Sequence, residues 1–391
     1  MSKKINIYYI IFLIATIVFF KPYYFTHFEI SVANFAYLNG LRLVFLLVLL
    51  IYILENKLSK FIILMLFFYL TKLISTIINS GSISALVTEI YPVLGICLLI
   101  EIGLRKNPKQ LVKAFATVLS FLTIVNFITI IVNPNGYHVI EKLIFFLGNR
   151  NQLAPFFILT IVVITLRNIY FPNKYRKIQL GLLLSICTFM IFHAGSGSNI
   201  IAWIPVTIYF IMPFISKKSK IFNIKSYLAL YIILFFTVIF YNIQERYADL
   251  LYRFLGKDVT FSGRIQLWNT GVEMIKNRPL IGYGMSDSSN IILSPISGRY
   301  LSAHNQFIQL MIEGGFVSMF AFGSIAYLTF KKLYEFKKSE VSKILSIGIF
   351  AVALVLFSEA MGFFYIFILF AFAYNIDKIV NTSANERRQL K

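Results

Sequence analysis

Charged side chains are scarce in this chain of 391 residues. Asp, Glu, Lys and Arg make up 14% of it, whereas hydrophobic residues make up 58%. Too few polar side chains remain to cover the surface of a soluble globule of this length. The mean hydropathy of +0.77 likewise shows that the chain is apolar as a whole. The composition therefore excludes a soluble globular protein and indicates an integral membrane protein.

Cysteines and ligand motifs are also scarce. The two cysteines, Cys97 and Cys187, both lie inside apolar runs, which is typical of packing residues rather than of a disulfide or a metal pair. No Cys/His spacing indicates a zinc site, and no glycine-rich phosphate loop precedes a helix. We therefore expect no bound metal, no cofactor and no domain that binds and hydrolyses a nucleotide.

A signal-peptide cleavage site is missing as well. The chain begins MSKKINIYYIIFLIATIVFF, which has a basic start and an apolar stretch, but FFKPYYF follows in place of small residues. We interpret this stretch as a first span that is retained.

Long apolar runs predict transmembrane helices. A helix needs about 20 residues to cross about 30 Å of hydrocarbon, where every backbone polar group must be bonded internally. Runs of this kind exclude a barrel. They predict twelve spans, at residues 5–20, 33–54, 60–79, 86–104, 110–132, 152–170, 178–194, 199–215, 227–243, 305–330, 342–358 and 361–376.

The predicted fold is thus an all-α polytopic membrane protein. Residues 1–243 hold spans one to nine, residues 244–304 form one large outer loop, and residues 305–391 hold the last three spans and a tail. Lys and Arg gather in alternate short connections, so the positive-inside rule places both termini in the cytoplasm. The net charge of +21 then reflects topology and attraction to the lipid surface, and no nucleic-acid partner is expected.

The large loop contains two amphipathic patterns. The first is QERYADLLYRFL, at residues 244–255. The second begins near Ser262, a candidate N-cap, carries Ile265 and Trp268 at helical spacing, and stops before Pro279. A turn is predicted at PLIGYGM. Such helices would lie at the membrane interface or over the mouth of a cavity.

Arginines in this loop are candidates for binding an anion. Their forked donors suit phosphate oxygens, although lipid headgroups or nearby carboxylates are alternative partners. The arginines are Arg246, Arg253, Arg264, Arg278 and Arg299. His304 stands where the loop re-enters the membrane and suits general-base work. The alternative is that it bonds the start of the following helix.

Three further cations lie near or within spans. Arg150 stands between Asn149 and Asn151 just before a span, where a helix N-terminus attracts phosphate; a cap that also contacts headgroups is the alternative. Arg42 lies well inside the second span and is a functional candidate, because intramembrane charges are costly. Lys72, nearer an outer end, is expected to extend outward. The candidate partners are Glu89 and Glu359.

Three patches resemble the bacterial O-antigen ligase and polymerase superfamily, which also contains capsular polysaccharide polymerases. The first comprises SGRIQLW and NRPLIGYGM, similar to the family's Gly-Arg, Leu-Trp and Pro-Leu-x-Gly-x-Gly pattern. The second is HNQFIQLMIEGGFVS, which has His304, Asn305 and Gly315 of the ligase-type motif but Ser318 where Gly, Thr or Tyr is expected. The third is GNRNQLAPFFIL. No role is transferred to HAGSGSN, where the family's usual arginine is missing.

This resemblance implies a metal-independent glycosyltransferase that uses undecaprenyl-diphosphate-linked glycans, as donor and acceptor, at the outer face of the bacterial cytoplasmic membrane. It implies that His304 takes the proton of the acceptor hydroxyl. It also implies that Arg264 and Arg150 stabilise the diphosphate with help from Arg278 or Arg299. The supporting residues would be Asn305, Asn151, Trp268, Gly315 and Arg42. Besides the bilayer, partners would be the chain-length regulator and the flippase of the same pathway.

Three functions remain open at this point. A polymerase that joins repeat units is favoured by Ser318 in the ligase-type motif and by the short loop. A ligase that moves finished polymer onto lipid A core or another acceptor shares the donor chemistry. A flippase for lipid-linked oligosaccharide belongs to another class, but transporters tend to show repeated halves with broken helices, and no such repeat is visible here.

Overall fold

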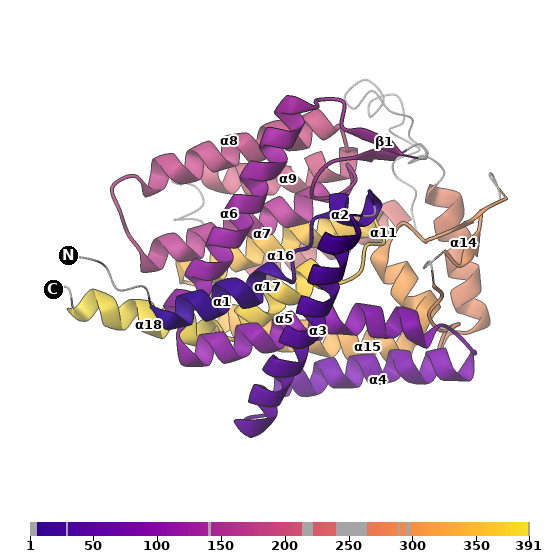
Figure 1. Ribbon diagram of the computed structural model, residues 1–391. Helices are drawn as coiled ribbons and strands as arrows, with labels where there is room; N and C mark the ends of the chain where they lie inside the picture. The colour runs from indigo at the N-terminus through magenta and orange to yellow at the C-terminus, as the bar shows by residue number, and fades with distance from the viewer. Residues whose placement is uncertain are drawn as a thin grey trace.

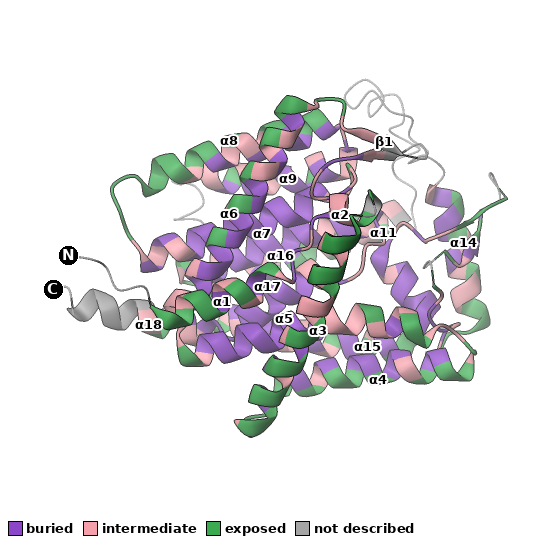
Figure 2. Cartoon of the chain, viewed as in Figure 1, coloured by how far each residue is buried: buried purple, intermediate pink, exposed green. Residues whose placement is uncertain are grey.

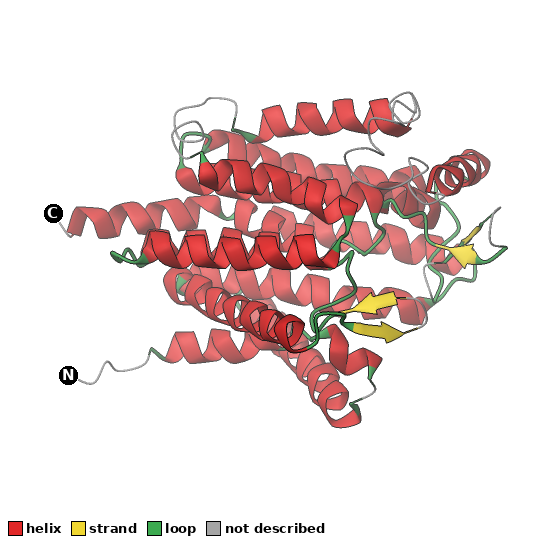
Figure 3. Cartoon of the chain, turned by 90° about the horizontal axis from the view of Figure 1, so that it is seen from above, coloured by secondary structure: helices red, strands yellow, loops and turns green. Residues whose placement is uncertain are grey.

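The computed structural model describes residues 6–28, 30–139, 142–212, 222–239, 264–287, 290–294 and 298–389. Within them the chain forms a bundle of helices with two pairs of short strands. Figure 1 shows the long helices side by side, with the first and last described residues at one end and α14 and β1 at the other. The view from above in Figure 3 gives the same arrangement.

The bounds of the helices follow the polar breaks in the sequence. Ser59, Ser82 and Asn107 each accept a hydrogen bond from the backbone of the first turn, and so begin α4, α5 and α6. The first seven helices are α1 (Ile7–Ile17), α2 (Tyr23–His27), α3 (Ser31–Leu54), α4 (Lys60–Ile78), α5 (Ile83–Lys106), α6 (Pro108–Val132) and α7 (Leu153–Tyr170). The later described helices are α8 (Arg176–Ala194), α9 (Gly197–Ile211), α11 (Ile224–Ile239), α14 (Arg264–Asn277), α15 (Gln306–Glu335), α16 (Glu340–Ser358), α17 (Phe364–Tyr374) and α18 (Ile376–Gln389).

The strands form two antiparallel pairs at one end of the bundle. β1 (Tyr137–Val139) pairs with β2 (Lys142–Ile144), with Tyr137 opposite Ile144. β3 (Ile292–Leu293) pairs with β4 (Tyr300–Leu301), with Ile292 opposite Leu301. These short pairs do not change the class: the protein is an all-α polytopic membrane protein.

A described helix overlaps each of the twelve ranges predicted as spans. Eight of the described helices are long and apolar enough to cross a membrane. Phe364–Tyr374 and Ile376–Thr382, which are bent by 53° relative to each other, make a ninth if the pair is one broken span rather than a re-entrant loop. Three further apolar helices among the described residues are shorter, with 10–17 residues: Ile7–Ile17, Gly197–Ile211 and Ile224–Val238. The polytopic class is therefore confirmed, whereas the count of twelve spans stays a prediction.

Burial rises from the edge of the bundle to its centre. The apolar window of α7 is 89% buried, whereas that of α3 is 17% buried. Figure 2 shows the contrast, with the exposed α3 in front of buried helices. α7 is apolar on every side, as a helix enclosed by others must be. α3 instead turns an apolar face outward, which suits contact with lipid.

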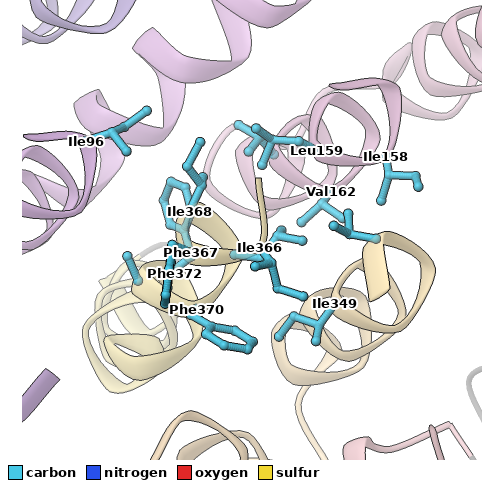
Figure 4. Packing of buried hydrophobic residues seen from close by; sticks show 14 of the residues in the cluster. Ile96, Ile158, Leu159, Val162, Ile349, Ile366, Phe367, Ile368, Phe370 and Phe372 are labelled. Atoms are coloured by element: carbon cyan, nitrogen blue, oxygen red, sulfur yellow. The ribbon is translucent and has the colours of Figure 1, made fainter. Parts of the chain in front are cut away.

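The centre of the bundle is packed with aliphatic and aromatic side chains. Figure 4 shows side chains from α5, α7, α16 and α17 converging there, among them Leu159, Ile349 and Phe367. Each of these three is at most 2% exposed. Dense packing of this kind fixes the helices relative to one another, and so provides a rigid base for the polar residues at the end of the bundle.

α15 is broken near its start, where Gly315 has φ +62° and ψ −166°. The turn after α14 fills the break. Tyr283 N donates to Ile312 O at 2.7 Å, and Phe316 N donates to Pro279 O at 2.8 Å. A Cβ at Gly315 would overlap the backbone of Leu280, so only glycine allows the two segments to approach this closely. The turn thus bonds the backbone groups that the break sets free.

Candidate functional site

Three segments meet at the strand-bearing end of the bundle and form the candidate site. They are the start of α14, the segment from β4 to the start of α15, and the end of α16. α14 packs on α15, and a small apolar cluster lies beneath it. The cluster consists of Leu267, Trp268, Ile292, Ala303, Ile308 and Ile312. The second predicted amphipathic helix is therefore confirmed as α14, with its apolar face on the bundle.

Trp268 fixes α14 in place. Its side chain is 2% exposed, and its ring lies 5.6 Å from that of Phe357 in an edge-on arrangement. Phe357 belongs to the last turn of α16. Because edge-on aromatic pairs add to the stabilisation that burial gives, Trp268 holds the start of α14 beside the end of α16.

His304 lies between β4 and α15. Asn305 caps the helix, because its Oδ1 accepts hydrogen bonds from Phe307 N and Ile308 N, both at 3.0 Å. The sequence left open whether His304 bonds the start of this helix. In the structure Asn305 forms those bonds instead. His304 has φ +45°, a left-handed conformation that costs a residue with a side chain about 1–2 kcal/mol. Its neighbours must therefore impose that conformation.

A carboxylate joins the histidine to the arginine. Glu359 Oε1 lies 2.5 Å from Arg264 Nη2, and Glu359 Oε2 lies 3.4 Å from His304 Nδ1. The carboxylate is 9% exposed, whereas the Arg264 and His304 side chains are 18% and 33% exposed. Nδ1 is the ring nitrogen that faces Glu359, so Nε2 is left for another partner. The guanidinium has five N–H donors, and most of them remain for a second anion.

Sequence reasoning missed the place of Glu359. The sequence made it only a candidate partner for an intramembrane cation, Arg42 or Lys72. It instead follows α16 directly, as its C-cap, and faces two residues of the loop. The usable signal was an acidic residue at the outer end of an apolar run, where an unpaired charge is costly.

Lys72 does not extend outward, so that expectation was wrong. Its side chain is 1% exposed, and its Nζ lies 2.6 Å from Glu89 Oε2 and 3.3 Å from Glu313 Oε2. Two carboxylates on neighbouring helices hold the amine inside the bundle: Glu313, which is 6% exposed, and Glu89, which the sequence offered as a partner and which is 18% exposed. Arg42, which we expected to be the better functional candidate, is exposed on the sparsely packed α3, away from the residues around Glu359.

The other predicted arginines lie on separate elements. Arg278 follows α14, donates to Asn79 Oδ1 and lies 4.8 Å from the Tyr283 ring. Arg299, just before β4, is exposed, and its backbone oxygen accepts from Ser294 N at 2.9 Å. Arg246 and Arg253, with the predicted helix at 244–255, lie outside the described residues.

Arg150 belongs to a different part of the same end. Its side chain is exposed, its backbone N donates to Leu143 O at 3.2 Å, and its backbone O accepts from Asn199 Nδ2 at 2.7 Å. Asn151 N donates to Asn149 Oδ1 at 2.9 Å, and α7 begins at Leu153. The structure therefore brings Arg264, His304 and Glu359 together, with Asn305, Trp268 and Gly315 around them, and leaves Arg150 on the loop before α7.

The fold and this site define a polytopic membrane protein with a cluster of basic and acidic side chains at one end of its bundle. Residues 180–323 match the family model described as O-antigen ligase. The match supports the O-antigen ligase and polymerase superfamily, and indicates a membrane enzyme of that type. It covers Arg264, His304 and Gly315 but neither Lys72 nor Glu359. No curated protein matches the chain.

Proposed function

We propose that this protein is a membrane glycosyltransferase that polymerises undecaprenyl-diphosphate-linked repeat units into O-antigen or capsular polysaccharide. The reaction would take place at the outer face of the bacterial cytoplasmic membrane, with both termini in the cytoplasm. One observation carries the proposal. Glu359 joins Arg264 and His304, and α14, which begins with Arg264, lies at the end of the bundle opposite the first and last described residues (Figure 1).

The chemistry needs a base and a cation. His304 Nε2 takes the proton of an acceptor hydroxyl as the hydroxyl oxygen attacks the anomeric carbon of the donor. The bond from that carbon to the lipid diphosphate breaks, and the diphosphate leaves with the electron pair. Glu359, facing Nδ1 at 3.4 Å, orients the ring and stabilises the imidazolium that forms.

Arg264 stabilises the leaving group. A fixed cation aimed at charge that develops in the transition state lowers the barrier, and the pair with Glu359 fixes the guanidinium. Arg278 and Arg299 would donate further hydrogen bonds to the oxygens of the diphosphate. Arg150 would bind the diphosphate from the loop before α7. Cleavage of the bond between the sugar and the lipid diphosphate supplies the free energy of the reaction, so no nucleotide is required.

Purified protein with lipid-linked repeat unit tests the proposal. We expect products that grow by whole repeat units, a reaction that transport cannot explain because no membrane is crossed. His304→Ala and Arg264→Ala should each lower the rate about a hundredfold. Lys276→Ala is the matched control, since Lys276 lies on the same helix and pairs only at the surface with Glu273. Full activity of both site variants, at normal folded yield, would refute the assigned roles.

A ligase is the second candidate, and the description of the matching family names that activity. Ser318 at the last position of the ligase-type motif favours the polymerase. Surface glycan from a deletion strain separates the two. Single repeat units on the acceptor indicate a missing polymerase, whereas long polymer left on the carrier indicates a missing ligase.

A further inference from the structure

A buried charged cluster lies beneath the site, and the proposed chemistry does not use it. Lys72 of α4 is held between Glu89 of α5 and Glu313 of α15, at 2.6 and 3.3 Å from their nearest oxygens. The side chains of Lys72 and Glu313 are 1% and 6% exposed. A charge inside a membrane protein is tolerated only when it is paired. The cluster therefore joins three helices through bonds that are costly to break.

Hydrogen bonds connect this cluster to the backbone beside His304. Glu313 Oε1 accepts from Gln309 Nε2 at 2.8 Å. Gln309 Oε1 in turn accepts from Ala303 N at 2.9 Å. Glu313, Gln309 and Ala303 are all buried, so water does not compete for these bonds.

The charge of Glu313 sets the direction of the connection. A carboxylate only accepts hydrogen bonds, so Gln309 must turn its amino group toward Glu313. Its oxygen is then left for the N–H of Ala303. The Lys72 amine lies 3.3 Å from the other oxygen of Glu313, so each carboxyl oxygen faces one donor. The chain of connected side chains thus runs from Lys72 through Glu313 and Gln309 to the backbone of Ala303.

The backbone at His304 is fixed from both sides. Gln309 holds Ala303 on one side, and the cap formed by Asn305 holds the other. Between them His304 keeps its left-handed conformation. A strained conformation persists only when its surroundings impose it, so loss of either anchor would let the residue relax and turn its ring.

Glu313 also lies next to the break in α15. Its backbone O accepts from Gly284 N at 2.9 Å and from Ser75 Oγ at 2.7 Å. The same residue therefore holds the turn after α14 through its backbone and the segment before His304 through its side chain.

We infer that Lys72, Glu313 and Gln309 are positioning residues that aim the His304 ring for proton transfer by fixing the backbone at Ala303. The inference rests on the proposed function, because it assigns these residues to the same transfer reaction. They do not touch the substrate, so their loss should lower kcat and leave KM for the lipid-linked donor nearly unchanged.

Gln309→Met gives the sharpest test, because methionine keeps the length of the side chain and removes both hydrogen bonds. The full-length purified protein is assayed with lipid-linked repeat unit. We expect kcat to fall about tenfold or more, with KM within about threefold of wild type. Thr329→Val is the matched control. Thr329 is also buried in α15, but its hydroxyl donates to Ile325 O of the same helix, so kcat should not change.

Glu313→Gln is the second variant, and it carries the test if Gln309→Met does not accumulate as folded protein. It keeps the shape of the side chain but no longer forces the orientation of Gln309, so kcat should fall in the same way. Wild-type kcat in either folded variant overturns the inference, as does a change confined to KM. His304→Ala is assayed in parallel. The proposed function fails if wild type forms no polymer, and the base role of His304 fails if His304→Ala keeps full activity. An inactive His304→Ala beside a fully active Gln309→Met removes only the positioning role.

Discussion

Glu359 and Arg264 form an ion pair at 2.5 Å although 95 positions separate them in the chain. The pair forms because α14 folds back onto the end of α16, where Trp268 packs against Phe357. Its carboxylate also faces His304. One acidic residue thus links a cation and a base that come from different segments.

Replacing Glu359 with glutamine should lower the transferase rate about tenfold to a hundredfold. The amide keeps the shape but loses the charge that holds Arg264 and stabilises a protonated His304. The measurement is kcat of purified protein with lipid-linked repeat unit. Glu273→Gln is the control, because Glu273 lies on α14 and pairs only with exposed Lys276. Equal activity of the two variants would contradict the role of Glu359.

Alanine at Gly315 should destabilise the protein, whereas alanine at Gly323 should not. Gly315 has φ +62° and lies against the backbone of Leu280, so a Cβ forces the turn after α14 out of the break. Gly323 belongs to the same helix and has open space around its Cα, where alanine favours the helix by about 1 kcal/mol. Thermal unfolding in detergent compares the two. Unfolding of Gly315→Ala at the wild-type temperature would argue against the interlocked turn.

Cysteine labelling should place the strand pair β3–β4 outside the cell. Tyr300→Cys, exposed in β4, is expected to react with a maleimide that cannot cross the membrane, in intact cells. Lys174→Cys, exposed between α7 and α8, should react only after the cells are permeabilised. The native Cys97 and Cys187 are buried, so the background should be low. The reverse pattern would invert the topology and remove the support for an outer site.

Glu55 should make stability depend on pH. Burial works to raise the pKa of this carboxyl, but the hydrogen bond from Lys106 and the charges of Arg105 and Lys106 outweigh it and hold the pKa below its ordinary value. A carboxyl with a lowered folded-state pKa stabilises the protein above its unfolded-state pKa, and that contribution disappears as the pH falls through the folded-state value.

Wild type should therefore unfold at a higher temperature than Glu55→Gln at neutral pH, and the difference should shrink as the pH falls below about 4.3, the ordinary pKa of a glutamate. Glu335→Gln is the control, because its pair with Lys332 is exposed and surface pairs contribute little. A difference between wild type and Glu55→Gln that stays constant over this range would contradict the assignment.

The helices could be predicted because their signals are local. Apolar runs bounded by Ser59, Ser82 or Asn107 carry both the hydrophobic length and the cap that a helix needs. The same holds for α14, which stops before Pro279 and is followed by a turn at Gly282 and Gly284. Hydropathy alone did not predict the depth of each helix in the bundle. α3 and α7 are both apolar, yet one lies at the edge and the other at the centre.

Arg264, His304 and Gly315 were found from their motifs, but their partners were not. Glu359 and Lys72 were visible as charges near span ends. The sequence offered Glu89 as a partner for Lys72, which the ion pair confirms, but it did not predict Glu313 as a second partner or Arg264 and His304 as the partners of Glu359. A charge within an apolar run shows that some partner exists, but the choice among several distant carboxylates depends on which helices are neighbours.

The sequence by itself determined that this is a helical membrane protein, where its helices begin and end, and which basic residues gather in one segment, because hydrophobic length, caps and charge are properties of short stretches. Only the tertiary structure decided that Glu359 faces both Arg264 and His304, that Lys72 is buried between Glu89 and Glu313, and that the turn after α14 enters the break at Gly315. These contacts join residues far apart in the chain, and they depend on the packing of α4, α5, α14, α15 and α16 against one another.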